Sequence, residues 1–160
     1  MFDIRPIDLR ENLPQIGNLI RRSFATVADE FGLTPQNCRY HPAFVDDDAT
    51  LAKLGKPGTL CFGGYVDGEL LGFMAIVPRR WRAYEGLRLA VAPEARQQGL
   101  GRALLDKCVE TAREQGARKL KAGVIDQNEP LKQWYARYGF RETGKKEWPS
   151  IVISYIEMRL

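Results

Sequence analysis

Histidine and cysteine are scarce in this sequence. Its 160 residues include one histidine, His41, and three cysteines, Cys38, Cys61 and Cys108. No two cysteines have the Cys-x-x-Cys spacing of a zinc site, and an odd number of distant cysteines argues against a disulfide framework. We therefore expect no metal site, and a reducing compartment, the cytoplasm, as the location of the protein.

Long apolar runs and long basic runs are also lacking. No stretch approaches the roughly 20 apolar residues that cross a bilayer, and the first residues show no signal-peptide pattern, so we expect no membrane partner. The formal net charge of +4 admits nucleic acid as a partner. Because the arginines are dispersed rather than clustered, the charge is better suited to a small anionic ligand, and we expect no nucleic-acid partner.

The length and the hydrophobic pattern favour one domain over residues 1–160. Apolar residues recur at helical spacing from Leu13 to Phe31, and Asp67-Gly68-Glu69 separates two strands of a hairpin. Strands at mid-chain with helices before and after them predict an α/β fold with a mixed sheet. The expected strands are 2–8, 59–66, 70–77, 83–92, 119–125, 140–145 and 151–160. The expected helices are 13–31, 99–115 and 128–138, together with a short helix that follows Asp46-Asp47-Asp48 and runs through Leu54.

The segment from Leu89 to Leu105 is the most informative part of the chain. It predicts a strand that ends before Pro93 and a helix that begins near Gly99. Acids normally favour the first turn of a helix, yet the first acid here is Asp106, and arginines flank the start instead. Exposed backbone N–H groups at a helix start bind phosphate, and glycine permits close approach. The segment therefore predicts an anion site, with an ordinary glycine-containing turn as the alternative.

Two other glycine-rich phosphate loops do not match this segment. The Gly-x-x-x-x-Gly-Lys-Ser/Thr pattern of a P-loop is absent, and position 104 is leucine where a dinucleotide fingerprint needs a third glycine. The run Arg96-Gln97-Gln98-Gly99-Leu100-Gly101 instead resembles the Arg/Gln-x-x-Gly-x-Gly/Ala loop that binds acetyl-CoA in the GNAT superfamily of N-acetyltransferases.

A second segment, Asn128 to Phe140, strengthens this resemblance. Asn128 is a good N-cap, Pro130 is tolerated in the first turn, and Gly139 suits the helix C-terminus. The segment is similar to the later motif of the same superfamily, Asn…(Phe/Leu/Trp)-Tyr-x-x-x-Gly-Phe. Both motifs occur in the expected order, and together they cover residues 83–145.

The resemblance implies an architecture and a cosubstrate. We expect a mixed, mostly antiparallel central sheet of six to seven strands flanked by about four helices, in which the fourth strand has a bulge and parts from the fifth. Acetyl-CoA is the expected cosubstrate, with its pantetheine arm in that gap. The residues expected to bind it are Leu89, Ala90, Val91, Arg96, Gln97, Gln98, Gly99, Leu100, Gly101, Arg102, Asn128 and Tyr135.

The same resemblance suggests two catalytic residues. Tyr135 matches the motif tyrosine that acts as general acid at the thiolate. If Tyr135 does not fill this role, Tyr138 is the next candidate. The alternative is that Tyr135 only packs in the core. Glu85 is the candidate base, directly or through water. On simple alternation Glu85 shares a face with Leu87, Leu89 and Val91, where apolar neighbours raise a carboxyl pKa, although a bulge disturbs this parity. Alternatively, Glu85 is only a solvated residue of the strand, and Asn128 serves only as the N-cap of its helix.

The sequence therefore predicts an N-acetyltransferase that moves an acetyl group from acetyl-CoA directly to a primary amine in a ternary complex. The acceptor is a small molecule or a peptide, and its pocket is expected among Tyr40, His41, Phe44, Trp81 and Trp148. A noncatalytic module that binds acyl-CoA on the same fold is the alternative. The sequence is also compatible with a homodimer.

Overall fold

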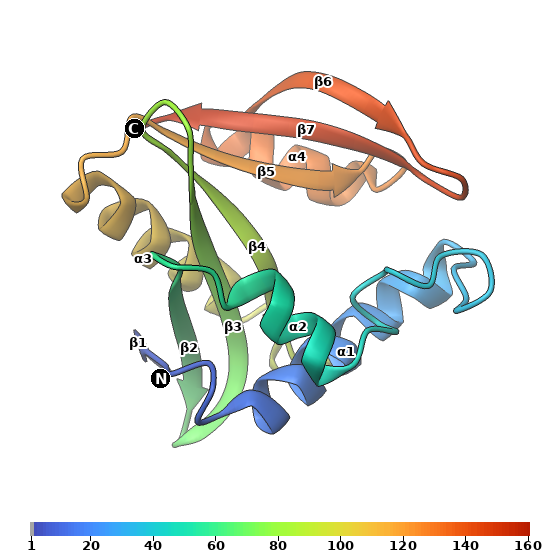
Figure 1. Cartoon of the computed structure of the whole chain (residues 1–160), viewed down its shortest axis with the longest axis horizontal. Coiled ribbons are helices and arrows are strands. Elements are labelled where there is room, and N and C mark those ends of the chain that lie inside the picture. Colours follow the sequence, from blue (N-terminus) through green and yellow to red (C-terminus); the bar gives the residue numbers. More distant parts are fainter. Residues whose placement is uncertain (1) are drawn as a thin grey trace.

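The computed structural model describes residues 2–160 and builds within them one seven-stranded sheet, in the order β1-β2-β3-β4-β5-β7-β6 (Figure 1). Every neighbouring pair is antiparallel except β4 and β5, which run parallel. The predicted mixed, mostly antiparallel sheet is confirmed. The strands are β1 (Phe2–Pro6), β2 (Leu60–Val66), β3 (Glu69–Arg79), β4 (Ala83–Val91), β5 (Lys119–Ile125), β6 (Arg141–Glu147) and β7 (Val152–Arg159).

Helices cover both faces of the sheet. The four α-helices within residues 2–160 are α1 (Leu13–Glu30), α2 (Asp47–Leu54), α3 (Leu100–Glu114) and α4 (Glu129–Tyr138), and a short 3-10 turn, η1 (Pro93–Ala95), precedes α3. In Figure 1, α1 and α2 lie in front of the central strands and α3 lies behind them. In the same range, none of these helices combines the length and the apolar character needed to span a bilayer.

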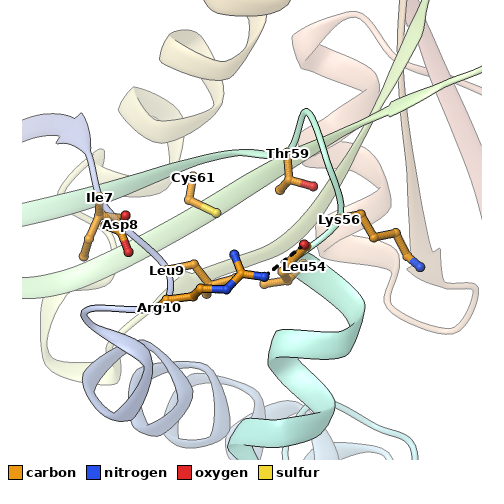
Figure 2. Close-up of a pocket in the computed structure, with 9 residues that line it drawn as sticks. Ile7, Asp8, Leu9, Arg10, Leu54, Lys56, Thr59 and Cys61 are labelled. Atoms are coloured by element: carbon orange, nitrogen blue, oxygen red, sulfur yellow. Dashed lines mark hydrogen bonds between the residues drawn. The ribbon is translucent and has the colours of Figure 1, made fainter.

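The strand register assigns the residues of β4 to the two faces. Leu87 pairs with Ala75, which pairs with Cys61 on β2. Cys61 lines a cavity together with Leu54 of α2, so this face is the one that α1 and α2 cover (Figure 2). Val91 pairs with Gly72 on the opposite face, beneath α3.

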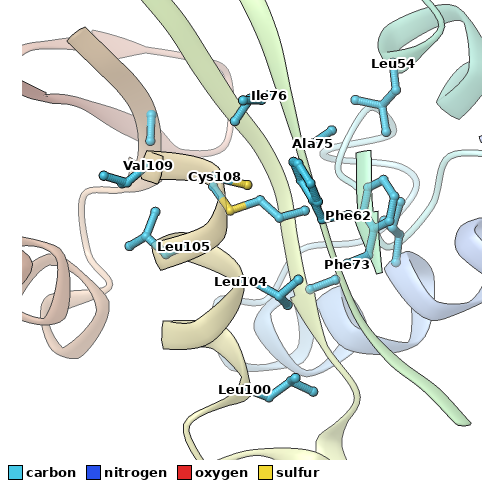
Figure 3. Close-up of a cluster of buried hydrophobic side chains, with 14 of the residues drawn as sticks. Leu54, Phe62, Phe73, Ala75, Ile76, Leu100, Leu104, Leu105, Cys108 and Val109 are labelled. Atoms are coloured by element: carbon cyan, nitrogen blue, oxygen red, sulfur yellow. The ribbon is translucent and has the colours of Figure 1, made fainter. Parts of the chain in front are cut away.

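Two glycines allow α3 to lie close to the sheet. A Cβ atom on Gly64 would come within 2.8 Å of the Leu100 Cδ1 atom, and a Cβ atom on Gly72 would come within 2.8 Å of the Leu104 Cδ1 atom. Such distances are shorter than packed carbon atoms tolerate. Leu100, Leu104 and Cys108 are buried against the strands, as Figure 3 shows, and their spacing confirms the predicted helical face.

The sheet opens between β4 and β5. The parallel pairing joins Ala83–Glu85 only to Lys119–Lys121, so within residues 2–160 the edge of β4 that faces β5 has no partner strand from Gly86 onward. Leu87 pairs with Ala75 and Ala90 with Phe73, which leaves two residues of β4 opposite one of β3. This is a β-bulge, and Arg88 within it has a φ of 58°. The expected bulge and the expected parting of the two strands are both confirmed.

A second hydrophobic cluster connects the end of α1 to the far side of this opening. Ala28 of α1 and Leu33 pack with Ile125 of β5, and Ile153 of β7 lies against them. The main core also spans the opening, because it includes Leu120 and Val124 of β5 and Ile156 of β7 together with residues of the central strands, α1 and α3. The two parts of the sheet are therefore joined by the short β4–β5 pairing, by the main core and by this second cluster.

Candidate functional site

The turn before α3 exposes a series of backbone N–H groups. Gln97 and Gly99 have left-handed φ values of 62° and 88°, and the first backbone hydrogen bond of the helix runs from the Ala103 N–H to the Gly99 carbonyl, at 3.0 Å. Within residues 2–160, the N–H groups from Gln97 to Arg102 donate no hydrogen bond. Unpaired N–H groups and the positive end of the helix dipole together suit an anion.

The Arg96 side chain was expected to flank the anion site, but it is turned toward α1 and β4 instead. Its guanidinium donates to the Ser23 carbonyl at 2.7 Å, to the Thr26 hydroxyl at 2.8 Å and to the Val91 carbonyl at 3.2 Å. Sequence spacing alone cannot show these partners because α1 lies far away along the chain. Arg96 therefore fixes the turn to α1 and β4.

An ion pair also joins α1 to the segment just before this turn. The Arg22 Nη1 atom on α1 lies 2.6 Å and 2.7 Å from the two carboxylate oxygens of Glu94. This hydrogen bonding holds the pKa of Glu94 below its usual range. The turn before α3 is thus held by two side-chain links to α1, and neither link can be predicted from sequence spacing.

Arg102 remains at the start of α3 with its side chain largely in solvent. Its guanidinium lies 4.7 Å from the centre of the Tyr138 ring, and its Nε lies 3.5 Å from an Asp106 oxygen. Among the neighbouring predicted residues, Gln98 makes a long 3.5 Å bond to the Glu94 carbonyl, and the Leu100 side chain is buried in the core. Leu100 can therefore contribute only its backbone to a ligand.

The strand segment predicted to pair with pantetheine lies where β4 has left β5. Leu89 falls in the bulge and Ala90 pairs with Phe73 of β3. The Val91 carbonyl already accepts the hydrogen bond from Arg96. We therefore expect the backbone groups before Val91 to provide most of the pairing capacity.

Tyr135 is positioned by aromatic packing on α4. Its ring meets Trp134 and Phe140 in edge-to-face contacts, with centroid distances of 4.9 Å and 5.2 Å. Burial raises the pKa of the Tyr135 phenol, so the hydroxyl keeps its proton at neutral pH. Tyr138, the fallback residue, instead donates its hydroxyl to Asp106 at 2.6 Å, which makes it less available for chemistry.

Asn128 is confirmed as the N-cap of α4. Its side-chain oxygen accepts a hydrogen bond from the Leu131 N–H at 3.3 Å. The side-chain amide donates no hydrogen bond within residues 2–160, so its N–H groups are available to a ligand. The capping role and the expected contact with pantetheine are therefore compatible.

The surroundings of Glu85 differ from the expectation. Glu85 pairs with Val77 and shares a face with Leu87, whereas Val91 lies on the α3 face because the bulge reverses the alternation. Glu85 also accepts a 2.8 Å hydrogen bond from the Arg79 Nε. It is therefore a partly exposed, ion-paired carboxylate rather than a carboxyl group among apolar side chains.

Sequence spacing does not indicate the surroundings of two further residues, Arg88 and His41. Arg88 lies in the bulge, and its Nε is enclosed without a hydrogen-bond partner within the described chain. His41, expected only as one of several pocket residues, is buried between Phe24 and Phe44, with ring centroids 5.9 Å and 5.8 Å away. An arginine between two leucines is typical of a solvated strand residue, so no sequence signal distinguishes Arg88.

The described residues also include a cavity of about 190 Å³ between the β1–α1 connection, the end of α2 and β2 (Figure 2). None of the predicted site residues lines it. No group of three histidine, cysteine, aspartate or glutamate side chains within residues 2–160 is arranged to hold a metal ion. The candidate site is therefore the opening between β4 and β5, together with the turn before α3.

Comparisons with known proteins agree with this geometry. The streptothricin acetyltransferase of Streptomyces lavendulae is 37% identical over 79 residues, which are 49% of this chain and 42% of that protein. This chain therefore matches less than half of that relative's length. The ribosomal-protein-S18-alanine N-acetyltransferase of Escherichia coli has the same fold, with a TM-score of 0.80, 19% identity and coverage of 99% of this chain and 94% of that one.

A further solved structure, the PaiA N-acetyltransferase of Thermoplasma acidophilum in complex with coenzyme A, has a TM-score of 0.75 and 19% identity, and covers 100% of this chain and 99% of that one. The family model of the acetyltransferase (GNAT) family matches residues 24–140. This match includes α3, α4 and the opening between β4 and β5. The chain therefore belongs to the acetyltransferase (GNAT) family.

Proposed function

We propose that this protein transfers the acetyl group of acetyl-CoA directly to a primary amine of a small molecule or a peptide. One observation carries the proposal. In the described part of the chain, the unpaired backbone N–H groups from Gln97 to Arg102 lie at the start of α3, next to the end of β4, which has no partner strand on its β5 side. An anion-binding turn beside an open strand edge suits a ligand with a diphosphate and an extended amide-bearing arm.

The residues around the opening fit such a ligand. The turn from Gln97 to Arg102 would hold the pyrophosphate, and the free edge of β4 would hydrogen-bond the pantetheine amides. The side-chain amide of Asn128 is available from the α4 side. Bound acetyl-CoA supplies an activated acetyl group, and the protein supplies alignment and proton transfer.

The two candidate catalytic residues lie on opposite sides of the sheet. Tyr135 belongs to α4, which contacts α3 through Tyr138 and Asp106, whereas Glu85 belongs to the face that α1 and α2 cover. The acceptor would enter from the Glu85 side. Glu85, directly or through water, takes a proton from the amine as the C–N bond forms, and Tyr135 protonates the thiolate as the C–S bond breaks.

Two of the three cysteines, Cys61 and Cys108, are poor candidates for an acyl carrier. Burial raises the pKa of the Cys61 thiol to about 11, and it also raises the pKa of Cys108. Thiols with such pKa values hold their protons at neutral pH, and the thiol is a much weaker nucleophile than the thiolate. This supports transfer within a ternary complex rather than through an acetylated enzyme.

A binding measurement followed by an acceptor screen tests the proposal. Calorimetry should show that acetyl-CoA and coenzyme A bind, and both ligands should raise the melting temperature by mass action. Free thiol release should then be measured across amino acids, polyamines, aminoglycosides and peptides. Binding with no turnover on any amine would favour a noncatalytic acyl-CoA module, and the absence of binding would refute both readings.

A further inference from the structure

Arg88 is a charged residue that the proposed reaction leaves without a role. It lies in the bulge of β4, in the part of the strand that has separated from β5. Its guanidinium makes no ion pair within residues 2–160, and its Nε is enclosed without any hydrogen-bond partner. A guanidinium has five N–H donors and stays charged at ordinary pH. Arg88 is only partly buried, but leaving the enclosed Nε–H donor of a charged group without a partner costs free energy, so the site is suited to receive an anion.

The nearest anionic side chain does not satisfy this charge. Burial lowers the pKa of Arg88, and the field of Glu85 only partly opposes that effect. The carboxylate of Glu85 is engaged by Arg79 at 2.8 Å, and Glu85 and Arg88 do not come within ion-pair distance of each other in the described chain. Arg88 therefore has donor capacity left for a ligand.

The buried imidazole on the same side adds no negative charge. His41 Nδ1 accepts a hydrogen bond from the Ala43 N–H at 3.2 Å, so the neutral ring carries its proton on Nε2. Burial, and then the charge of Arg88, lowers the pKa of His41 to about 4. His41 is thus uncharged at neutral pH and offers a donor rather than a counter-ion.

The geometry points to an acceptor that carries a carboxylate close to its amine, such as a free amino acid, with the carboxylate bound by Arg88 and the amine directed to Glu85. This inference rests on the proposed acetyl transfer. Glu85 and Arg88 are three positions apart, and a strand rises about 3.3 Å per residue, so their backbones lie within about 10 Å. Two long side chains can close on one small zwitterion across that distance. A polyamine would instead place a second cation beside Arg88.

Matched acceptors test the inference. We would measure kcat/KM for each standard amino acid, for its carboxamide, and for the amine without the carboxyl group. The carboxamide keeps the size and the amine but loses the negative charge. Because a charge-assisted bidentate contact is lost, the carboxylate form should be preferred by about ten- to hundredfold in wild-type protein.

Arg88→Met is the decisive variant, and Arg80→Met is its control. Methionine is unbranched, so it tolerates the left-handed backbone about as well as arginine, while Arg80 is an exposed arginine outside the site. The preference for carboxylate over carboxamide should fall to near unity in Arg88→Met and stay unchanged in Arg80→Met. Affinity for acetyl-CoA should be the same in all three proteins.

A binding readout makes the inference independent of turnover. With coenzyme A saturating, amino acids should raise the melting temperature of wild-type protein but not of Arg88→Met. The inference is overturned if carboxylates and carboxamides react equally, if Arg88→Met keeps the preference, or if no amino acid either reacts or stabilises the protein. Failure of acetyl-CoA to bind would instead refute the proposed function itself.

Discussion

The Nη2 of Arg96 donates a hydrogen bond to the carbonyl oxygen of Ser23 at 2.7 Å, and Ser23 lies on the buried side of α1. Arg96 also reaches the Thr26 hydroxyl one turn further along that helix. The turn that offers its N–H groups to an anion is therefore held from α1. This arrangement separates two roles of Arg96, bracing the turn and contacting phosphate, that a motif alone cannot distinguish.

Replacing Arg96 by methionine tests the bracing role. We expect a loss of about 1 to 3 kcal/mol in stability without ligand, because several hydrogen bonds to a charged group disappear. Acetyl-CoA should also bind more weakly. Urea unfolding and calorimetry check both effects, with Arg80→Met as control. An unchanged unfolding curve combined with weaker binding would mean that Arg96 contacts the phosphate directly.

Two substitutions at Gly101 separate bulk from charge at the start of α3. A Cβ atom at this position would lie 3.6 Å from the Val91 Cγ2 atom, an ordinary contact, so Gly101→Ala should fold and largely keep its affinity. Gly101→Asp places a carboxylate at the proposed phosphate position and should abolish acetyl-CoA binding. Calorimetry with both variants measures this. Equal affinity in the two variants would show that the phosphate binds elsewhere.

The hydroxyl of Tyr135 should matter for turnover and not for acetyl-CoA affinity. Tyr135→Phe keeps the edge-to-face contacts with Trp134 and Phe140, and we expect kcat to fall roughly 10²-fold because acid catalysis is lost. Tyr138→Phe is the matched control, since that hydroxyl is bound to Asp106 on the surface, and it should change kcat little. Wild-type turnover in Tyr135→Phe would show that this tyrosine only packs.

A pH profile tests Glu85 as the base. Glu85→Gln should lower the rate most at low pH and recover partly at high pH, where the free amine is abundant. The substitution also frees Arg79, so Arg79→Gln is needed to isolate the loss of the ion pair. If the Glu85→Gln profile matches wild type at every pH, Glu85 is a bystander and water or another group accepts the proton.

His41 makes stability depend on pH in a defined direction. Its pKa falls from 6.5 to about 4 on folding, mainly through burial, so the unfolded chain binds a proton first as the pH falls. Stability is therefore intact above about pH 6.5 and declines as the pH falls toward 4. We expect His41→Phe to reduce this decline by about 1 to 2 kcal/mol in urea unfolding. Parallel pH curves for the two proteins would contradict the assignment.

The helices and strands of this fold can be predicted from the sequence because the residue patterns that indicate them are local. The hairpin at Asp67-Gly68 has φ values of 50° and 83°, which is the turn that this dipeptide favours. The apolar spacing of α3 matches its buried face, and Asn128 caps α4 as its residue type suggests. The parting of β4 from β5, by contrast, came from resemblance to a family and not from the residues themselves.

The arrangement of the site cannot be predicted from the sequence because the residues that contact one another there are distant along the chain. The links between Arg96 and Ser23 and between Arg22 and Glu94 join segments about seventy positions apart. The bulge at Arg88 reverses the alternation that would have placed Glu85 beside Val91. Periodicity describes one element at a time, so it cannot predict which side chains from separate elements meet.

The second hydrophobic cluster, Ala28, Leu33 and Ile125 with their neighbours, gives the opening in the sheet a mechanical support. β4 and β5 share only three paired positions in the described chain, and so short a pairing does not by itself determine the distance between the two strands beyond it. The width available to both substrates then depends on the packing that spans the opening, which includes the contacts of the end of α1 with β5 and β7 as well as the main core. Enlarging or trimming a side chain in this cluster should alter the KM for donor and acceptor together, although none of its residues belongs to the reacting centre.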